Sequence, residues 1–387
     1  MVLTENNFDE ASELVKLASS LIKCGDGSGS NQDVFQILID YFSDFKPKQV
    51  VVDGNGKPNL YLEIGKSGPL LVFVGHSDVV SAGDFSKWNH LPFSGTYDDE
   101  YLYGRGSVDM RAAVAAFAVG LKLSAKDILK KIRVGFVVTS DEETTSLGAP
   151  AVLDFLAQDK EKISMCLVGE PSSRIKTGDK IRIGRRGGLS GHFVFSGVAG
   201  HVAYTRGDSN ILNVAIEAAN KLLSLKWEED QLPWPAPNFH VTNFQSGTGE
   251  NNTVPNKAEF KINIRFGPSI SKELVVSRCE EALAEFGQFE VKWSTGFIPY
   301  FTTDEKIIQL VSKSIEQSTG LSPEIAVDGG TSDGRFFSSR GIPTIEVGSP
   351  AIGLHELNEA IKINDLENLS MIYRSLIKDI SESGLLK

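Results

Sequence analysis

Histidine and carboxylate side chains recur in this sequence where short apolar runs have just ended. His76 follows one such run, Glu142 and Glu143 follow a second, and Glu170 follows a third. Zinc in proteins takes nitrogen and oxygen ligands in sets of three or four, and a catalytic site keeps one position open. The pattern therefore indicates a metal site.

Each of these residues, taken singly, also has an ordinary structural explanation. His76 and Asp78 could form a surface or cap pair, Asp109 precedes an apolar helical segment and could cap it, and residues 141–143 could be a solvated acidic loop. Against these explanations, carboxylates packed together repel one another, and a bound cation would offset the repulsion. Asp78 stands two residues after His76, which suits a second carboxylate that fixes the tautomer of a ligating imidazole.

The joint pattern favours two metals. One set of five residues, with Asp109 shared, supplies three ligands to each of two cations about 3.5 to 4 Å apart. Imidazole and carboxylate together favour Zn²⁺, with Co²⁺ or Mn²⁺ as substitutes. The candidate ligands are His76, Asp109, Glu143, Glu170 and His355.

Apolar, β-branched runs alternating with helical segments must position these ligands. Such runs are typical of a largely parallel sheet covered on both faces, and in α/β sheets ligands bind at the carboxyl ends of strands. We therefore expect an α/β fold in which the polar residues after the strands converge. The predicted strands are Leu70–Val74, Ile132–Thr139, Ile163–Val168 and Thr344–Val347, and the predicted helices are Asp9–Lys23, Asn31–Phe45 and Arg111–Leu123.

A second pattern interrupts the first over residues 179–294, which we predict to be an inserted domain. The order strand, helix, strand, strand, helix, strand is that of a ferredoxin-like α+β sandwich. Residues 1–178 and 295–387 would then form the catalytic domain. The predicted elements are Ile181–Phe195, Asn210–Leu225, His240–Gln245, Lys257–Phe266, Lys272–Phe286 and Glu290–Ser294.

Composition excludes several classes of function. The formal net charge of −11 and the lack of a basic run argue against nucleic acid as a partner. No apolar stretch approaches the roughly 20 residues of a membrane span, and the acidic start Met1–Glu10 is no signal peptide. The three cysteines form no Cys-x-x-Cys pair. These features predict a cytoplasmic protein that does not enter the membrane.

Seven short motifs carry a resemblance that spans nearly the whole chain. The sequence resembles the co-catalytic zinc aminoacylases and exopeptidases, and within them the family of succinyl-diaminopimelate desuccinylases. The motifs that carry the metal ligands mark the superfamily, and the last two motifs point to the desuccinylases. The motifs are Gly75–Val80, Gly104–Met110, Thr139–Glu143, Val168–Ser173, Gly200–Tyr204, Gly184–Leu189 and Gly329–Phe336.

The resemblance assigns the ligands to two metal positions. It implies that His76 and Glu170 complete one metal, Glu143 and His355 complete the other, and Asp109 bridges the two. It also implies a cis peptide bond after Asp109.

Catalysis and assembly are implied in the same way. Glu142 would act as the general base beside the metals. His201 would stabilise the oxyanion from the inserted domain of a partner subunit, so the inserted domain would serve dimerisation and the enzyme would be a homodimer. The remaining histidines match no motif.

The resemblance further implies a set of substrate-binding residues, of which the two arginines would bind substrate carboxylates in a bidentate manner. Asn251 and Asn252 are adjacent, so the amide that contacts substrate could be either. The implied residues are Arg185, Tyr204, Asn252, Arg265, Gly330 and Thr331.

We therefore expect metal-dependent hydrolysis of N-succinyl-LL-2,6-diaminopimelate to succinate and LL-2,6-diaminopimelate, a step of lysine and diaminopimelate synthesis. A related acetylornithine deacetylase, carboxypeptidase or aminoacylase would share the metals and differ in the acyl pocket. A metal-binding scaffold without chemistry is a third alternative. Glu142 argues against the scaffold, because a structural zinc site needs no spare carboxylate.

Overall fold

The chain folds into two compact units in the computed structural model, which describes residues 5–27, 29–124, 128–158, 162–227, 234–247 and 249–386, with side chains from residue 12 onward. Unit 1 comprises Met1–Ile183, Thr302–Ala326 and Ser332–Lys387, and unit 2 comprises Gly184–Phe301 and Val327–Thr331. The sequence predicts an insert over 179–294, and unit 2 starts and ends somewhat later than that.

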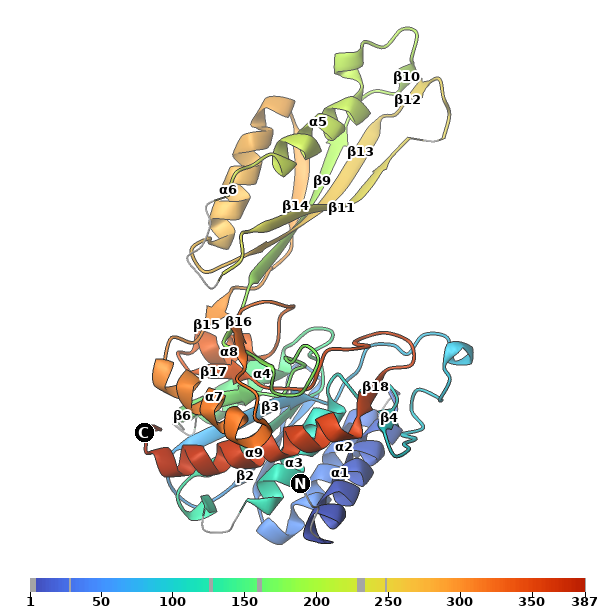
Figure 1. The fold of residues 1–387 in the computed structure, drawn as a ribbon. Coiled ribbons are helices and arrows are strands. Elements are labelled where there is room, and N and C mark those ends of the chain that lie inside the picture. The colour runs from blue at the N-terminus through green and yellow to red at the C-terminus, as the bar shows by residue number, and fades with distance from the viewer. Residues whose placement is uncertain are drawn as a thin grey trace. The chain divides into compact units, whose positions relative to one another are not determined.

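An eight-stranded sheet forms the centre of unit 1, in the order β1-β2-β5-β3-β6-β17-β7-β16 (Figure 1). β3 pairs in parallel with β5 and β6, and β17 continues in parallel with β6. The β1–β2, β2–β5 and β17–β7 pairs are antiparallel. The predicted α/β fold with a mostly parallel centre is thus confirmed. The strands are β1 (Lys48–Asp53), β2 (Pro58–Ile64), β3 (Leu70–His76), β5 (Arg133–Thr139), β6 (Ile163–Val168), β7 (Lys180–Arg182), β16 (Glu324–Ala326) and β17 (Thr344–Glu346).

Helices cover both faces of this sheet. On one face α3 packs against α1 and α9, and α9 packs against α7. Phe73 of β3 stacks on Phe117 of α3 with ring centroids 4.0 Å apart, and Tyr373 of α9 meets both rings edge-on. α4 and α8 bury apolar side chains against the other face. The helices are α1 (Glu5–Lys23), α2 (Ser30–Tyr41), α3 (Arg111–Leu123), α4 (Gly148–Gln158), α7 (Glu305–Thr319), α8 (Gly334–Ser339) and α9 (Ile363–Ser383).

Every residue of β3 is buried, which explains why its apolar run is continuous and not alternating. Apart from this sheet, β4 (Tyr101–Tyr103) and β18 (Ala360–Lys362) pair antiparallel near the ligand loops. Among the described residues no helix is long and apolar enough to cross a membrane. Short 3₁₀ helices complete the list: η1 (Ser43–Phe45), η2 (Phe85–Lys87), η3 (Ile128–Lys130), η4 (Gly207–Ser209) and η5 (Ala284–Phe286).

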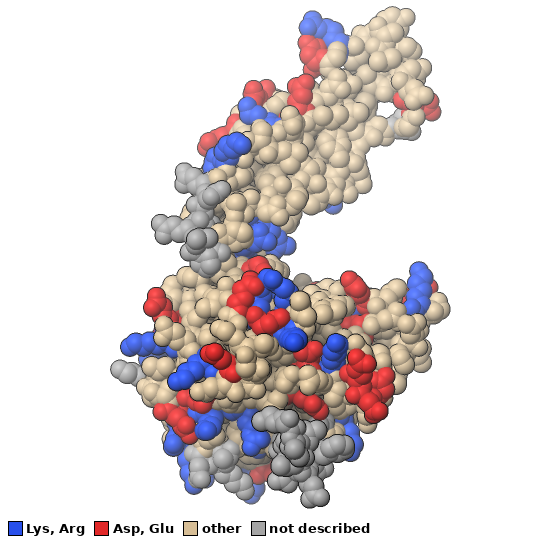
Figure 2. Space-filling view, viewed as in Figure 1, with Lys and Arg blue, Asp and Glu red and all other residues tan. Residues whose placement is uncertain are grey.

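Charged side chains of both signs are interspersed over the drawn face of unit 1, whereas unit 2 carries a broad area without Lys, Arg, Asp or Glu on that face (Figure 2). The charged residues of unit 2 that are visible lie mainly over its helices and at its two ends.

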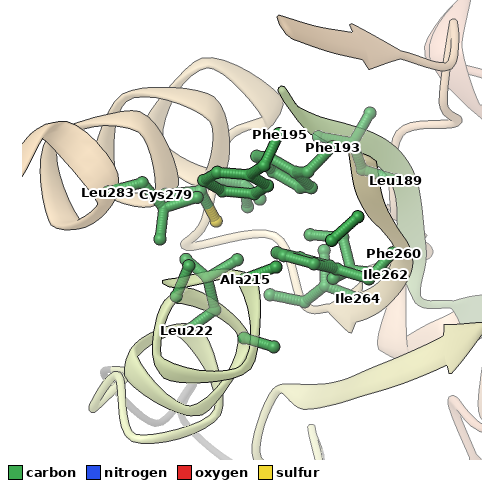
Figure 3. Close-up of a cluster of buried hydrophobic side chains, with 14 of the residues drawn as sticks. Leu189, Phe193, Phe195, Ala215, Leu222, Phe260, Ile262, Ile264, Cys279 and Leu283 are labelled. Carbon is green, nitrogen blue, oxygen red and sulfur yellow. The ribbon is translucent and has the colours of Figure 1, made fainter. Parts of the chain in front are cut away.

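Unit 2 is a four-stranded antiparallel sheet, in the order β11-β13-β9-β14, with two helices on one face. Alternate residues of β13 are buried, so one face of the sheet points into the core. The stacked rings of Phe193, Phe195 and Phe260 pack there in one cluster with Ala215, Leu222 and Leu283 of the helices (Figure 3). The elements are β9 (Gly187–Ser196), α5 (Ile211–Leu223), β11 (Asn238–Ser246), β13 (Lys257–Phe266), α6 (Lys272–Leu283) and β14 (Phe289–Trp293), with short pairs β8 (Gly184–Arg185) with β15 (Tyr300–Phe301) and β10 (Gly200–His201) with β12 (Thr253–Val254).

One prediction about strands was wrong, and one hairpin was not predicted. The single strand predicted over Ile181–Phe195 is three strands, because β7 belongs to the sheet of unit 1 and β9 to the sheet of unit 2, with β8 between them. The hairpin β1–β2 at the edge of the large sheet has no predicted counterpart.

Candidate metal centre

Three adjacent strands of the large sheet bring ligand residues to one edge. His76 is the last residue of β3, Glu142 and Glu143 follow β5, and Glu170 follows β6. Since β5, β3 and β6 lie side by side in parallel, their carboxyl ends coincide. This convergence is the one predicted from the sequence.

Asp109 lies between the imidazoles of two histidines. Its Oδ1 is 3.1 Å from Nε2 of His76, and its Oδ2 is 3.0 Å from Nε2 of His355. Asp109 precedes α3, and His355 lies in the loop before β18. The Asp109–Met110 peptide bond is cis, as the resemblance implies.

One further carboxylate accompanies each histidine. Oε1 of Glu170 lies 3.6 Å from Nε2 of His76, and Oε1 of Glu143 lies 3.0 Å from Nε2 of His355. The five side chains thus form two triplets that share Asp109, and the structure brings together all five predicted ligands.

Glycine is required where the chain passes Glu170. A Cβ atom at Gly348 would lie 2.0 Å from the carbonyl oxygen of Glu170, closer than any side chain can approach backbone. Gly348 follows β17, which lies next to β6. The close approach of these two strand ends therefore helps to place the Glu170 carboxylate.

The histidine pKa values reflect the surrounding carboxylates. Burial favours the neutral form of His76, but its hydrogen bond with Asp109 and the charges of Asp109, Asp78 and Glu170 hold its pKa well above the usual value. The hydrogen bond with Asp109, opposed by partial burial and reinforced by Glu143, raises the pKa of His355 to about 9. The site therefore attracts positive charge.

This donor set fits two divalent cations. Three carboxylates and two imidazoles face one another, and the raised pKa values of the two histidines favour their protonated, positively charged forms when no metal is bound. Metal ions compete with protons for such ligands. Two bound cations would therefore take the place of protons that the site already favours.

Glu142 has an oxygen within 4.8 Å of the ligand atoms of His76 and Glu170. Burial, with smaller contributions from Asp333 and Asp109, raises the pKa of Glu142 to about 8. A carboxyl whose pKa lies near neutrality can both accept and return a proton. In the metal-free site, its position beside the ligands and its raised pKa would suit a general acid–base.

Asp78 supports the site mainly through its carboxylate. Its oxygens accept hydrogen bonds from the backbone N–H groups of Glu142 at 3.3 Å and of Glu143 at 3.0 Å. Nδ1 of His76 lies 2.9 Å from the Asp78 carbonyl oxygen and 3.6 Å from the carboxylate. The Asp78 residue thus orients the imidazole chiefly by its backbone and the base loop by its side chain.

Asp141 is a site residue for which the sequence suggested no role. Its fully buried carboxylate accepts hydrogen bonds from the backbone N–H of Leu147 at 2.7 Å and of Gly148 at 2.9 Å, where α4 begins. It therefore holds the loop of Glu142 and Glu143 to a helix N-terminus. Because no helix is predicted over residues 148–158, the sequence pattern does not indicate this role.

His201, Tyr204 and Asn252 lie together at the β10–β12 pair of unit 2. The side chain of Tyr204 is 90% exposed, and its ring centroid is 5.6 Å from that of His201. The Asn252 carbonyl oxygen accepts a hydrogen bond from the Val202 N–H at 3.0 Å. Nδ1 of His201 accepts from the Ala203 N–H at 3.2 Å, which leaves the proton on Nε2.

The predicted arginines lie at the other end of unit 2. Arg185 is buried on β8, and its Nη1 donates to the Gly330 carbonyl oxygen at 3.4 Å, next to Thr331. Arg265 on β13 lies over the ring of Phe297 at 4.8 Å. Burial and then the charge of Arg186 lower the pKa of Arg265. An anion here would relieve the repulsion between these cations.

Comparisons with known proteins agree with this geometry. The sequence matches a family described as peptidase family M20/M25/M40 over residues 72–379. A succinyl-diaminopimelate desuccinylase of Hydrogenovibrio crunogenus is 35% identical over 371 residues, covering 95% of this chain and 98% of the relative. Aminopeptidase PepT of Bacillus cereus superposes with a TM-score of 0.78 at 18% identity, over 96% of this chain and 98% of that chain. YXEP of Bacillus subtilis, described as a dinuclear metal-binding peptidase of the M20 family, superposes with a TM-score of 0.67 at 16% identity, over 96% and 98%. At sequence identities this low, the similarity to solved structures shows the fold alone.

Proposed function

Because the chain belongs to peptidase family M20/M25/M40, we propose that it is a metal-dependent amidohydrolase that cleaves N-succinyl-LL-2,6-diaminopimelate to succinate and LL-2,6-diaminopimelate. The observation that carries the hydrolase assignment is the position of Asp109 between His76 and His355, with one carboxylate oxygen facing each imidazole. The names of curated relatives that are 34–36% identical supply the substrate.

His76 and Glu170 would hold one divalent metal, Glu143 and His355 the other, and Asp109 would bridge the two. We refer to these as the His76 position and the His355 position. Zn²⁺ suits the imidazole and carboxylate ligands, with Co²⁺ or Mn²⁺ as substitutes. When bound, the two cations would polarise the scissile carbonyl and lower the pKa of a water molecule towards about 7.

Glu142 moves the proton. Its carboxylate accepts a proton from the attacking water as the new bond to the carbonyl carbon forms, and returns it to the nitrogen of the leaving amine as the amide bond breaks. Asp78 holds the backbone of Glu142 in place, and Asp141 anchors the same loop to α4.

His201 supplies a hydrogen-bond donor for the oxyanion that develops on the carbonyl oxygen. Because its Nδ1 accepts from the Ala203 N–H, its Nε2–H is free to donate. Removal of such a donor costs about a hundred- to a thousand-fold in kcat in other hydrolases.

Substrate recognition rests on the arginines of unit 2. Arg185 and Arg265 can bind carboxylates in a bidentate manner, and an acidic protein needs such local positive charge to hold an anionic substrate. Tyr204, Asn252 or its neighbour Asn251, Gly330 and Thr331 would supply further polar contacts.

A homodimer is part of this proposal. β11 lies at the edge of the unit 2 sheet, and none of its residues from Asn238 to Ser246 is charged. Edge strands of monomeric proteins are usually protected by charge or proline, so an uncharged edge favours pairing with another strand. Ile216 and Leu223 of neighbouring α5 are 51% and 52% exposed. A second copy of unit 2 would cover both the uncharged edge strand β11 and these exposed apolar side chains of α5. A cytoplasmic location remains a prediction from the sequence.

Metal analysis coupled to an acyl-group assay tests the proposed function. The purified protein is expected to bind two Zn²⁺ per chain and to hydrolyse N-succinyl-diaminopimelate with a kcat/KM far above that for the N-acetyl compound. Equal kcat/KM values would reject the substrate in favour of a related deacetylase or aminoacylase. Two bound metals without hydrolysis of any amide tested would favour a scaffold.

A further inference from the structure

Two of the five ligands do not come from strand ends of the large sheet. Asp109 lies in the loop after β4, and His355 lies in the loop before β18. The antiparallel pairing of Tyr103 with Ala360 brings these loops together, and the Gly104 N–H donates to the Glu359 carbonyl oxygen at 2.9 Å.

The Glu359 side chain reaches from the loop of His355 into the loop of Asp109. It is 1% exposed, and its Oε1 accepts hydrogen bonds from three backbone N–H groups. The donors are Gly106 at 3.0 Å, Val108 at 2.7 Å and Asp109 itself at 3.2 Å. One carboxylate oxygen thus holds the backbone of the bridging residue.

Arg105 reaches in the opposite direction. Its guanidinium is buried, forms an ion pair with Oε2 of Glu359, and donates from Nη2 to the His355 carbonyl oxygen at 3.3 Å. It also lies over the ring of Trp88 at 5.4 Å. Arg105, which stands four positions before Asp109, therefore holds the backbone of His355.

His355 depends on this contact more than His76 does. His76 is 1% exposed and lies in β3, where strands on both sides hold the backbone. His355 has a side chain that is 45% exposed, and its backbone has a φ of 62°, in a loop that lacks regular pairing. The loop is also held by Asn358, whose Oδ1 accepts from the Asn89 N–H at 2.6 Å.

We propose that Arg105 and Glu359 are positioning residues that set the separation of Asp109 and His355 and thereby the affinity of the His355 position for metal. The proposal rests on the two-metal centre proposed above. Burying an ion pair costs desolvation energy and rarely adds stability by itself. Here the same pair makes four backbone hydrogen bonds that connect a bridging ligand to a terminal ligand. Changes to residues that orient metal ligands typically lower metal affinity about 10- to 100-fold.

Titration of the metal-free protein with Co²⁺ tests this. The wild type is expected to bind two Co²⁺, and His355→Ala shows which binding step belongs to the His355 position. In Glu359→Gln the amide oxygen can still accept from the backbone, but the amide nitrogen faces Arg105. We expect the His355 step to weaken about 10- to 100-fold, with the His76 step unchanged within about threefold. The visible absorption of Co²⁺ at the His355 position should change as well.

Arg105→Lys keeps the positive charge beside Glu359 but not the branch that reaches His355, and it is expected to show the same selective loss. If Glu359→Gln does not fold, Arg105→Lys still tests the positioning role. The matched control is Glu63→Gln, which breaks the partly buried pair of Glu63 with Arg133 at the other end of β5. This control should leave both Co²⁺ affinities unchanged.

Equal weakening of both steps in Glu359→Gln, wild-type affinity for both, or the same loss in Glu63→Gln would overturn the positioning role. A wild-type protein that binds fewer than two Co²⁺ would instead reject the two-metal centre itself.

Discussion

Asp109 is the residue that the two groups of candidate metal ligands share. Its two oxygens face the imidazoles of His76 and His355, and its own N–H is held by Glu359. A carboxylate held on both sides in this way can offer one oxygen to each of two cations. Glu142 stands next to the ligands without taking part in either triplet of short contacts, and its function can therefore be separated from metal binding.

We expect Glu142→Gln to bind two Zn²⁺ per chain and to lose kcat by about a hundred- to ten-thousand-fold, because the amide cannot accept the proton. Metal content measured by atomic emission and initial rates on the succinylated substrate check this. Glu367→Gln is the control, because Glu367 is a half-buried carboxyl on α9 whose pKa is also raised by burial. A Glu142→Gln variant with near-normal turnover would exclude Glu142 as the base.

The ligand residues could be predicted because each stands beside an apolar run or in a recognisable motif. Asp141 and Glu359 could not be predicted in the same way. Their partners are backbone N–H groups, which carry no sequence signature. The N–H groups that donate to Glu359 come close to its carboxylate only because β4 pairs with β18, and these two strands are far apart in the sequence.

At the scale of elements, the start of α4 and the end of β5 are joined by one carboxylate. Asp141 accepts from Leu147 and Gly148, and the loop between carries Glu142 and Glu143. The loop that carries Glu142 is therefore anchored to the N-terminus of α4. Asp78 adds a second anchor from the end of β3.

Asp141→Ala should lower the free energy of unfolding of the zinc-loaded protein by at least about 1–2 kcal/mol and should also lower kcat, because the base loop loses its anchor. Urea denaturation and rate measurements test both effects. The control is Asp304→Ala at the N-terminus of α7, where Asp304 accepts from Lys306 and Ile307. It should cost about 1 kcal/mol without a change in kcat. Unchanged kcat in Asp141→Ala would show that the loop does not need this anchor.

The buried parallel strands were the most predictable elements, since strands covered on both faces read as continuous apolar runs. Residues 163–168 and 111–123 match the predicted strand and helix at both ends. The division of Ile181–Phe195 into β7, β8 and β9 was not predicted, although the polar and glycine residues 184–188 interrupt the run where the chain passes from one sheet to another. Which sheet each strand joins depends on partners that are distant in the sequence.

At the scale of the whole molecule, the five proposed metal ligands lie in unit 1, whereas His201, the proposed oxyanion donor, and all six proposed substrate-binding residues lie in unit 2. The proposed dimer assigns His201 to the site of the partner subunit. An uncharged edge strand and exposed apolar residues of α5 support such an assembly. The dimer and the origin of His201 can be tested together.

Mixing two inactive variants tests this arrangement. In a heterodimer of Glu142→Gln with His201→Ala, one of the two sites would contain both an intact Glu142 and an intact His201 from the other chain. We expect subunit exchange to restore up to about a quarter of wild-type activity, because half of the dimers are mixed and each has one complete site. Activity no higher than the sum of the two parents would place His201 in the site of its own chain.

Stability of the metal-free protein should depend on pH in a defined direction. The pKa of His355 is raised from 6.5 to about 9, chiefly by the hydrogen bond with Asp109, so its contribution is complete below pH 6.5 and is lost as pH rises to 9. Burial raises the pKa of Glu142 from 4.5 to about 8, so stability also falls as pH rises through that range.

We therefore expect urea denaturation of chelator-treated protein to show lower stability at pH 9 than at pH 6. Added Zn²⁺ should offset the loss, and Glu142→Gln should show a shallower pH dependence. A metal-free protein whose stability stays level or rises over this range would contradict the electrostatics described for the site.

Anomalous diffraction from crystals of the zinc-loaded protein tests the central claim most directly. Data collected at the zinc edge should show two peaks about 3.5 to 4 Å apart, both within bonding distance of Asp109, with His76 on one and His355 on the other. A single peak, or a second peak that does not touch Asp109, would contradict the bridged two-metal centre.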